Sequence, residues 1–391
     1  MGLCRLGDGW IAVASRSEVI RIRDTDGDKV ADESETLVRL VTEQTYPHNG
    51  LTGLAVGPDQ WLYIGQGENL GDPYAIVAAD GSKQSGGGEG GHIVRCRFDG
   101  SDLQRYATGL WNPFGMYFDP AGRLWTVGND PDAMPPCRLI EIASDGDYGF
   151  QFRFGRAGTH PLQAWNGELP GTIPMAAGTG EAPCAIVGYG DRLWVSSWGD
   201  NRIEAYRLQP NGASWKSETE VVVQGDANFR PVGMAVADDG SIYVTDWVDR
   251  SYPVHQKGRL WRLSRTPDAG AVSQRLPERS AAEKRRLQLE SDSELDVAER
   301  LAALDDQDPF IQQAAVAGLI TTGQLASIRK EDAESPGQRV GMLTAWRWVD
   351  LAFGDDHGSH DGISAEDRDA LIAWGLEDDS SDVVITAMRW A

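Results

Sequence analysis

Short runs of alternating apolar and polar residues fill the sequence up to about residue 265. Each run has the length of a strand and is bounded by Gly, Asp or Pro, a pattern typical of antiparallel sheets. Beyond this point apolar residues recur every three or four positions among Ala, Leu, Glu and Arg, which predicts helices. The stretch 266–283 contains Pro, Ser and Ala without clear periodicity. We therefore divide the chain into a β part over 1–265, a linker over 266–283 and an α part over 284–391.

One pattern repeats within the β part. A strand, a Pro-Asp or Asp-Gly turn and a second strand with large apolar residues begin at Gly53, Gly115 and Gly233. Weaker copies begin near the start of the chain and at Cys184. Copies at intervals of roughly 45–70 residues suit four-stranded propeller blades. With five copies visible, we predict an all-β six-bladed β-propeller whose first blade is incomplete. A generic sandwich does not explain copies this regular.

The α part repeats as well. DPFIQQAAVAGL from Asp308 and SDVVITAMRWA from Ser381 share one spacing of apolar residues, and SPGQRVGMLTAW around Pro336 fits between them. Helical repeats of this kind predict an all-α HEAT-like solenoid that offers a surface to a protein partner. No signal-peptide pattern precedes the first strand, and the last helix pattern carries no cap. We therefore expect a fragment of a longer protein with a truncated solenoid.

The charge balance excludes two classes of partner. Lys and Arg number 36 against 59 Asp and Glu, a net charge of −23. Nucleic acids and anionic lipids both require a basic face, so neither is an expected ligand.

No apolar run reaches the roughly 18–20 residues of a membrane span. The four cysteines lack zinc or haem spacing. A pairing of Cys137 with Cys184 remains open.

An acidic loop, DTDGDKVADESE, has the carboxylate spacing of a calcium site. Calcium prefers six to eight oxygen ligands, which this loop offers at positions 1, 3, 5, 7, 9 and 12. The expected ligands are Asp24, Asp26, Asp28, the Val30 carbonyl, Asp32 and Glu35. Lys29 stands where such loops usually have the glycine of a sharp turn. The alternative is an acidic, solvated turn between strands.

Three polar residues stand immediately before or at the start of repeat strands. His48 precedes the copy at Gly53, while Asn112 and Arg230 hold the equivalent positions in their own copies. Residues there face the top of the central tunnel of a propeller. A histidine with a pKa near neutrality is a candidate general base. The alternative for His48 is a loop histidine bonded to backbone.

Four segments, in this order, resemble the glucose/sorbosone dehydrogenase family. They are HNGLTGLAVGPDQWLYIGQG, LWNPFGMYFDPAGRLW, GDYGFQF and RPVGMAVADDGSIYVTDW. Members of that family are six-bladed propellers that bind pyrroloquinoline quinone (PQQ) and calcium. The ending DWVDRSYPVHQKGRLWRL is most similar to membrane-bound dehydrogenase-like proteins of planctomycete-type bacteria, in which HEAT-like repeats follow the propeller. The resemblance covers about residues 3–265 and implies a periplasmic or cell-envelope location.

The resemblance also assigns residue roles. His48 matches the family's base, which takes the proton of the substrate hydroxyl. Asn112 matches the Asn of an Arg-Asn-Pro-x-Gly signature in which Trp111 replaces Arg, and the Trp111 ring could stack on a planar cofactor. Arg230 matches one of two arginines that bind the cofactor carboxylates, and Asn228 stands at the partner position.

The function implied by this resemblance is oxidation of a sugar or related alcohol. The protein would depend on PQQ and calcium and pass electrons to an acceptor such as cytochrome c. Asp130-Pro131 is the nearest equivalent of the family loop whose main-chain oxygens hold the calcium. Two alternatives stay open: a non-catalytic module that binds carbohydrate or protein, and a metal-dependent lactonase-type propeller.

Overall fold

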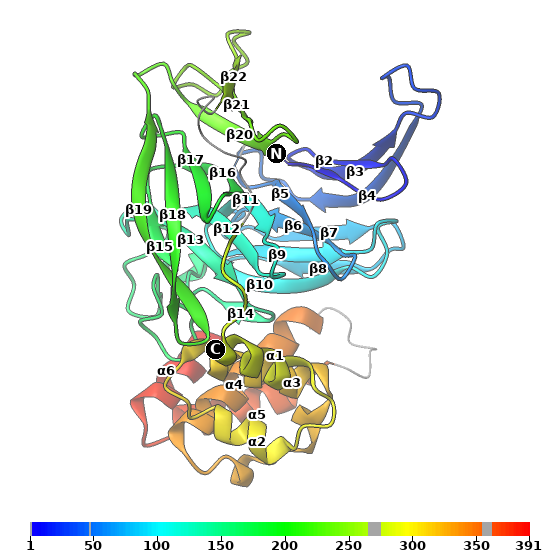
Figure 1. Cartoon of the computed structure of the whole chain (residues 1–391). Helices are drawn as coiled ribbons and strands as arrows, with labels where there is room; N and C mark the ends of the chain where they lie inside the picture. Colours follow the sequence, from blue (N-terminus) through cyan, green and yellow to red (C-terminus); the bar gives the residue numbers. More distant parts are fainter. Residues whose placement is uncertain (1, 47, 265–274, 354–361) are drawn as a thin grey trace.

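The computed structural model describes residues 2–46, 48–264, 275–353 and 362–391. Within these ranges, five β-sheets are followed along the chain by six α-helices, which gather at one end of the sheets (Figure 1). All neighbouring strands pair antiparallel except β10 and β14.

The sheets follow one another along the chain, except that β7 and β8 of sheet A come after β6 of sheet B and β14 of sheet B comes after β13 of sheet C. Sheet A has the order β1 (Leu3–Arg5), β2 (Ile11–Ala14), β3 (Glu18–Arg23), β4 (Glu33–Val41), β7 (Tyr74–Ala78), β8 (Lys83–Gly86). Sheet B has the order β14 (Gly146–Asp147), β10 (Gln104–Leu110), β9 (Gly91–Cys96), β6 (Leu62–Gln66), β5 (Leu51–Val56). Sheet C comprises β11 (Asn112–Phe118), β12 (Leu124–Asn129), β13 (Cys137–Ile142) and β15 (Ala177–Thr179). Sheet D comprises β16 (Pro183–Tyr189), β17 (Arg192–Ser197), β18 (Arg202–Asn211) and β19 (Ser214–Gln224). Sheet E comprises β20 (Pro231–Val236), β21 (Ile242–Asp246) and β22 (Arg259–Leu263).

Aspartates fix the hairpin turns that the repeat pattern indicated. In the turn from β11 to β12, one carboxylate oxygen of Asp119 accepts the N–H groups of Ala121 and Arg123 at 2.9 and 3.0 Å. Asp239 accepts the Ser241 N–H in the same way in the turn from β20 to β21. A side chain that bonds the backbone two residues onward stabilises a turn locally. The repeated Asp therefore explains why each copy folds as a hairpin.

The first strands of the later sheets pack side by side as in a propeller. β5 packs on β11, β11 on β16 and β16 on β20. Apolar residues fill each space between sheets, for example Leu62 between sheets A and B, Trp125 between C and D, and Ile242 between D and E. The prediction of six blades is wrong, because the described residues form five sheets.

The expected α-solenoid is also wrong. The helices are short: α1 (Ala281–Ser291), α2 (Val297–Ala303), α3 (Pro309–Thr321), α4 (Pro336–Phe353), α5 (Ala365–Leu376) and α6 (Ser381–Trp390). Three 3-10 turns, η1 (Phe152–Phe154), η2 (Gln324–Ser327) and η3 (Lys330–Asp332), complete the helical segments. None of the described helices is both long and apolar enough to cross a bilayer.

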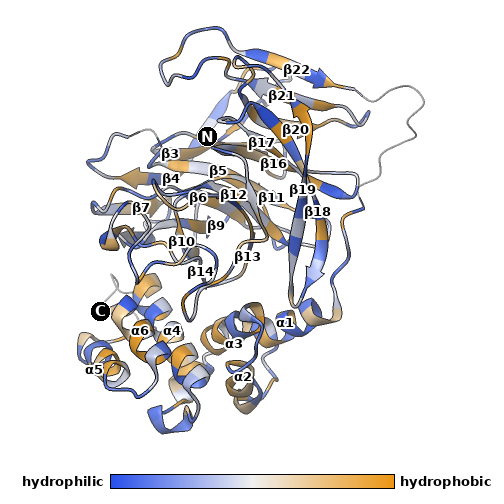
Figure 2. Ribbon diagram, turned by 90° about the vertical axis from the view of Figure 1, so that its left-hand side faces the viewer, coloured by the Kyte–Doolittle hydropathy of each residue, from blue (hydrophilic) through white to orange (hydrophobic). Residues whose placement is uncertain are grey.

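The helices cover the β part instead of extending away from it (Figure 2). Leu289 of α1 and Phe310 of α3 share a buried cluster with Tyr63 of β6 and Ile140 of β13. The periodic spacing of apolar residues indicates that one face of a helix is buried, but it does not indicate whether a sheet or another helix covers that face. The open surface expected for a protein partner is therefore not formed by the described helices. Of the expected linker, residues 266–274 lie outside the described residues, and α1 begins within its last positions.

A buried carboxylate at the end of β14 joins the helices to the sheets. Asp147 accepts hydrogen bonds from Arg347 of α4 at 2.7 Å, Arg389 of α6 at 2.9 Å and the Gly149 N–H at 2.8 Å. Burial alone would raise the pKa of Asp147, but Arg389 and Arg347 lower it well below its ordinary range. A second buried ion pair, Arg286 to Glu141 at 2.7 Å, joins α1 to β13.

Replacing Asp147 by Asn should lower the free energy of unfolding by about 3–5 kcal/mol, because two buried guanidinium groups lose their counter-charge. Chemical denaturation measures this loss. Asp132→Asn, which removes an exposed pair with Arg156, is the matched control and should change stability by less than about 1 kcal/mol. Because the pKa of Asp147 is depressed on folding, its contribution is present above the unfolded pKa near 3.9 and fades as the pH falls below it. Equal stabilities for D147N and D132N at pH 7 would refute the structural role.

Candidate functional site

The sequence-predicted polar residues lie at one end of the sheets, which we call the mouth. It is the end at which β5, β11, β16 and β20 begin and at which their partners β6, β12, β17 and β21 finish. His48 lies three residues before β5, Asn112 opens β11 and Arg230 immediately precedes β20. The mouth therefore collects residues from separate sheets.

His48 is half-buried among aromatic rings. Its ring centroid lies 5.2 Å from that of Tyr46, 5.7 Å from Phe114 and 5.0 Å from Tyr252. Tyr252 comes from the connection between β21 and β22, so the last sheet contacts the loop that precedes β5. Burial lowers the pKa of His48 below its ordinary value of 6.5. The imidazole is therefore neutral at pH 7 and able to accept a proton.

Asn112 is buried directly behind His48. Its neighbours orient the side-chain amide: the NH₂ group donates to the carbonyls of His48 and Trp111, and the oxygen accepts from Trp111 Nε1, each at 3.1 Å. Gly67 lies against this junction, where a Cβ would collide with the His48 carbonyl and the Asn112 amide. Asn112 thus fixes the backbone that carries the imidazole.

Trp111 packs into an internal aromatic cluster. Its ring lies 4.9 Å from Phe150, edge to face, and 6.1 Å from Phe152, nearly parallel. Phe150 and Trp165 complete the cluster. In this arrangement the indole supports Asn112 and packs against protein aromatic rings.

Arg230 is a buried cation whose guanidinium forms no salt bridge among the described residues, although the Asp246 carboxylate is near enough to favour its charge. Its Nη1 donates to the Trp198 carbonyl at 2.8 Å, and the guanidinium lies over the Trp198 ring at 4.6 Å. Its Nε has no hydrogen-bond partner. Burial and the nearby charge of Arg250 both lower the pKa of Arg230. Asn228 is exposed, and its carbonyl accepts from Arg259. Arg230 and Arg250 thus bring two guanidinium groups without salt bridges close together, an arrangement that suits an anionic ligand.

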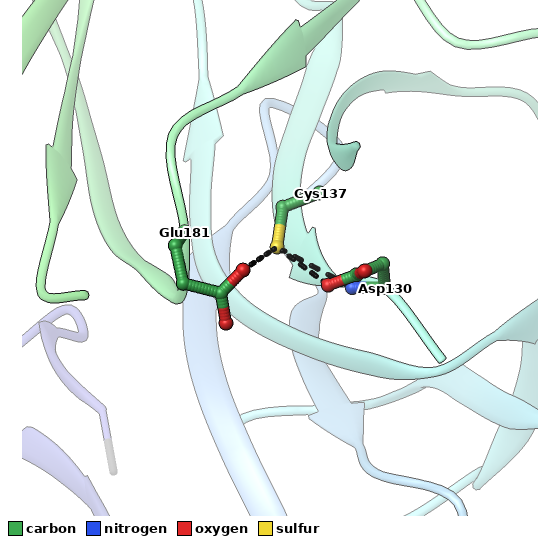
Figure 3. A group of neighbouring side chains, drawn as sticks. All are labelled: Asp130, Cys137 and Glu181. Atoms are coloured by element: carbon green, nitrogen blue, oxygen red, sulfur yellow. Dashed lines mark hydrogen bonds between the residues drawn. The ribbon is translucent and has the colours of Figure 1, made fainter. Parts of the chain in front are cut away.

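A group of three possible metal ligands was missed by sequence reasoning (Figure 3). The Cys137 thiol lies 3.0 Å from Asp130 Oδ1 and 3.7 Å from Glu181 Oε2, and all three ligand atoms lie within 4.8 Å of one another. Burial and the charge of Asp130 raise the pKa of Glu181. Burial and the Asp130 carboxylate raise the pKa of the Cys137 thiol, so it is protonated when no metal is bound. As a thiolate beside two carboxylates it would suit zinc better than calcium, which prefers oxygen.

The structure explains why this group was overlooked. Asp130 follows β12, Cys137 opens β13 and Glu181 precedes β16, so the three are adjacent only after the strands have paired. Their shared place at strand ends facing the mouth is the signal that could have found them. The same end holds two buried amides, Asn49 and Gln66, whose polar atoms are partly or wholly without partners.

The acidic loop lies at the tip of the hairpin formed by β3 and β4. The structure brings Asp24, Asp26 and Asp28 within 4.8 Å of one another. Asp32 instead accepts hydrogen bonds from Thr25, and Glu35 pairs with Arg21 on the neighbouring strand. Asp24 also accepts the N–H groups of Gly27 and Lys29, and Lys29 adopts a φ of 72°. The backbone therefore makes the expected sharp turn without glycine at that position.

Comparison with known proteins gives distant relatives. Residues 1–142 match a family described as a domain of unknown function, DUF7133. No curated protein matches. A protein of Thermus thermophilus described as an oxidoreductase (glucose dehydrogenase) is 18% identical, with a TM-score of 0.43, over 67% of this chain and 95% of that one. The PQQ-bound aldose sugar dehydrogenase of Streptomyces coelicolor is 16% identical, with a TM-score of 0.41, over 67% and 92%.

The PQQ domain of pyranose dehydrogenase from Coprinopsis cinerea, in its holo form, is 15% identical, with a TM-score of 0.43, over 63% of this chain and 78% of that one. These structures belong to the class that the sequence motifs resemble. At such identities and TM-scores they assign no activity to this chain.

If the acidic loop binds calcium, thermal stability should rise when calcium is added. For a dissociation constant near 1 mM, 10 mM calcium adds about 1.4 kcal/mol. Asp26→Ala with Asp28→Ala should abolish this gain, because two of the three converging carboxylates are lost. Asp238→Ala, an exposed aspartate outside the loop, is the control and should keep the gain. A calcium shift that survives in the double variant would show that the loop is only a solvated turn.

Proposed function

We propose that the mouth is the active site of a dehydrogenase that oxidises a sugar or related alcohol with PQQ as its cofactor. The observation that supports this proposal is the neutral imidazole of His48, held by Asn112 and the surrounding rings at the end of the sheets where Arg230 also lies. In this proposal an acceptor such as a cytochrome takes the electrons. The location is the periplasm or cell envelope.

The residues at the mouth fit an anionic cofactor. PQQ carries three carboxylates, and Arg230 offers a buried guanidinium whose Nε is unbonded. Arg250, which is exposed and has no ion pair among the described residues, would provide the second cation. Charge-assisted hydrogen bonds to such groups are the strong ones. When bound, PQQ would supply the two-electron oxidising power that protein side chains lack.

The chain's own residues supply the proton chemistry. A ring nitrogen of the neutral His48 takes the proton of the substrate hydroxyl as general base. Asn112 keeps the His48 backbone in place through its hydrogen bond to the carbonyl. The rings of Tyr46, Phe114 and Tyr252 limit the access of water to the imidazole. Because burial lowers the pKa of His48, the base stays in its active form down to pH values below 6.5.

A second candidate function is a metal-dependent hydrolase of the lactonase type. The group of Asp130, Cys137 and Glu181 favours it, because these side chains would hold a divalent cation at the mouth. Such a cation would supply Lewis acidity to a substrate carbonyl. The two candidates require different ligands at the same end of the sheets, so they are separable by experiment.

Replacing His48 by Ala should lower turnover on the best sugar or alcohol of a panel by about 10²–10⁴-fold, the usual contribution of a positioned base. PQQ affinity, measured by calorimetry, should hardly change. His160→Ala removes a loop histidine stacked on Phe154 and is the matched control. Arg250→Ala should show the opposite pattern and weaken PQQ binding by roughly 10-fold or more. Wild-type protein that binds no PQQ with calcium present would exclude the dehydrogenase.

For the second candidate, wild-type protein should bind zinc more tightly than calcium at the mouth. Cys137→Ser should weaken zinc binding by at least about tenfold, since it removes the thiolate that favours zinc. Cys184→Ser, at another strand of the same end, should leave it unchanged. Metal titration by calorimetry and a lactone-hydrolysis assay with and without zinc measure the two effects. Zinc-independent hydrolysis, or none at all, would count against the lactonase type.

A further inference from the structure

A cavity of about 390 Å³ lies where the helices meet the β part, away from the mouth. One wall is the loop 167–173, which follows β14 and η1 in the chain, and the other is formed by α3, α4 and the start of α6. Its volume is within the range of small-molecule sites. It shares no residue with the group around His48, so it can be tested independently of the proposed function.

Two of the glutamines that line the cavity each use one amide N–H within the protein. Gln313 is 3% exposed, and its Nε2 donates to the Ser144 carbonyl at 2.9 Å. Gln312 Nε2 donates to the Asp306 carbonyl at 2.6 Å. Because only the NH₂ group can donate to a carbonyl, these bonds fix the orientation of both amides. The Oε1 atoms remain as acceptors without a partner among the described residues.

The hydroxyl groups of the two threonines that line the cavity also donate their protons within the protein. Thr344 Oγ1 donates to the Val340 carbonyl at 2.8 Å, and Thr172 Oγ1 donates to the Leu169 carbonyl at 2.6 Å. Both residues are buried. A hydroxyl has one proton, so each oxygen can offer only lone pairs to a ligand.

The helix starts add few donors. α3 and α4 both begin with proline, which has no N–H. In the first turn of each helix, the Phe310 N–H is bonded by the Asp308 side chain at 2.9 Å and the Gln338 N–H by Ser335 Oγ at 3.1 Å. The positive ends of these helices are thus largely satisfied within the protein.

Two carboxylates complete the lining. Glu168 accepts the N–H groups of Trp165 and Asn166, each at 2.7 Å. Burial raises the pKa of Glu168, but these hydrogen bonds outweigh it and lower the pKa, so the group is ionised at pH 7. Asp382 lies exposed in the first turn of α6 and has no ion pair within the described residues. The cavity therefore presents several acceptors and two carboxylates.

We propose that this cavity binds a small organic cation that carries an ammonium or guanidinium group on an aliphatic stem. The nitrogen would donate to Gln313 Oε1 and to the carboxylates, while Ile173, Val316 and Val340 line the space for the stem. An anion would meet like charge, and a neutral polyol would bring no positive charge to the two carboxylates. The cation can be a free amine or an Arg or Lys side chain of a peptide, since both present the same group.

The proposal is tested by calorimetry on the full chain with agmatine, with 1,4-butanediol as the uncharged analogue and the tripeptide Gly-Arg-Gly as the peptide source. Agmatine should bind and butanediol should not. Stronger binding of agmatine indicates a free amine as the natural ligand, and stronger binding of the tripeptide indicates a protein side chain. Wild-type protein that binds neither cation at millimolar concentration, or binds butanediol equally well, overturns the proposal.

Two variants locate the site. Asp382→Asn should weaken agmatine binding by about two- to fivefold, the usual effect of an exposed charge. Asp379→Asn, an exposed aspartate outside the cavity lining, should leave it unchanged. Gln313→Leu should weaken it by roughly tenfold or more, with folding checked by circular dichroism. Equal effects of D382N and D379N, or a folded Q313L protein that binds as wild type, contradict the assignment. If Q313L does not fold, the comparison of D382N with D379N decides.

Discussion

The carboxylate of Asp147 is the contact on which the joining of the two parts depends. It is buried between Arg347 and Arg389, which belong to α4 and α6, and it stands on the outermost strand of sheet B. A buried charge is tolerated only when its partners and hydrogen bonds are all present. Without the other part, the helices or this edge of the sheet would leave charged groups unpaired, which costs free energy of folding. The α part serves as the cover of the β part, which accounts for helices that are short and apolar on the inner side.

A series of contacts connects Asp147 with His48 at the mouth. Two residues beyond Asp147, Gly149 donates to its carboxylate, and the next residue, Phe150, packs on Trp111. Trp111 in turn bonds Asn112, which bonds the carbonyl of His48. The position of the candidate base thus depends on a continuous series of contacts that begins at the helices. The Trp111 indole supports Asn112 by both packing and a hydrogen bond.

Features that depend on neighbouring residues in the sequence were predicted correctly from it, whereas features that depend on which elements pack together were not. Turn aspartates and the alternation of apolar residues predicted the hairpins, and the place of His48, Asn112 and Arg230 at strand starts predicted their common end. The number of sheets and the arrangement of helices were predicted wrongly, because periodicity reports burial without naming the neighbour. The proximity of Cys137 to Glu181 escaped notice because strand pairing alone brings them together, and Cys137 is free and not paired with Cys184.

The charges at the mouth act on one another, and this coupling bears on both candidate functions. Arg230 donates to the Trp198 carbonyl, the Gly199 N–H donates to the Glu181 carbonyl, and the charge of Arg250 acts on both Arg230 and Glu181. An anionic ligand beside the arginines would neutralise Arg250 and remove its stabilising effect on the Glu181 carboxylate. The two acidic groups would then hold a cation more strongly, since their mutual repulsion would lack any other counter-charge. An anion bound at Arg250 would therefore favour a cation between Asp130 and Glu181 and would not oppose it.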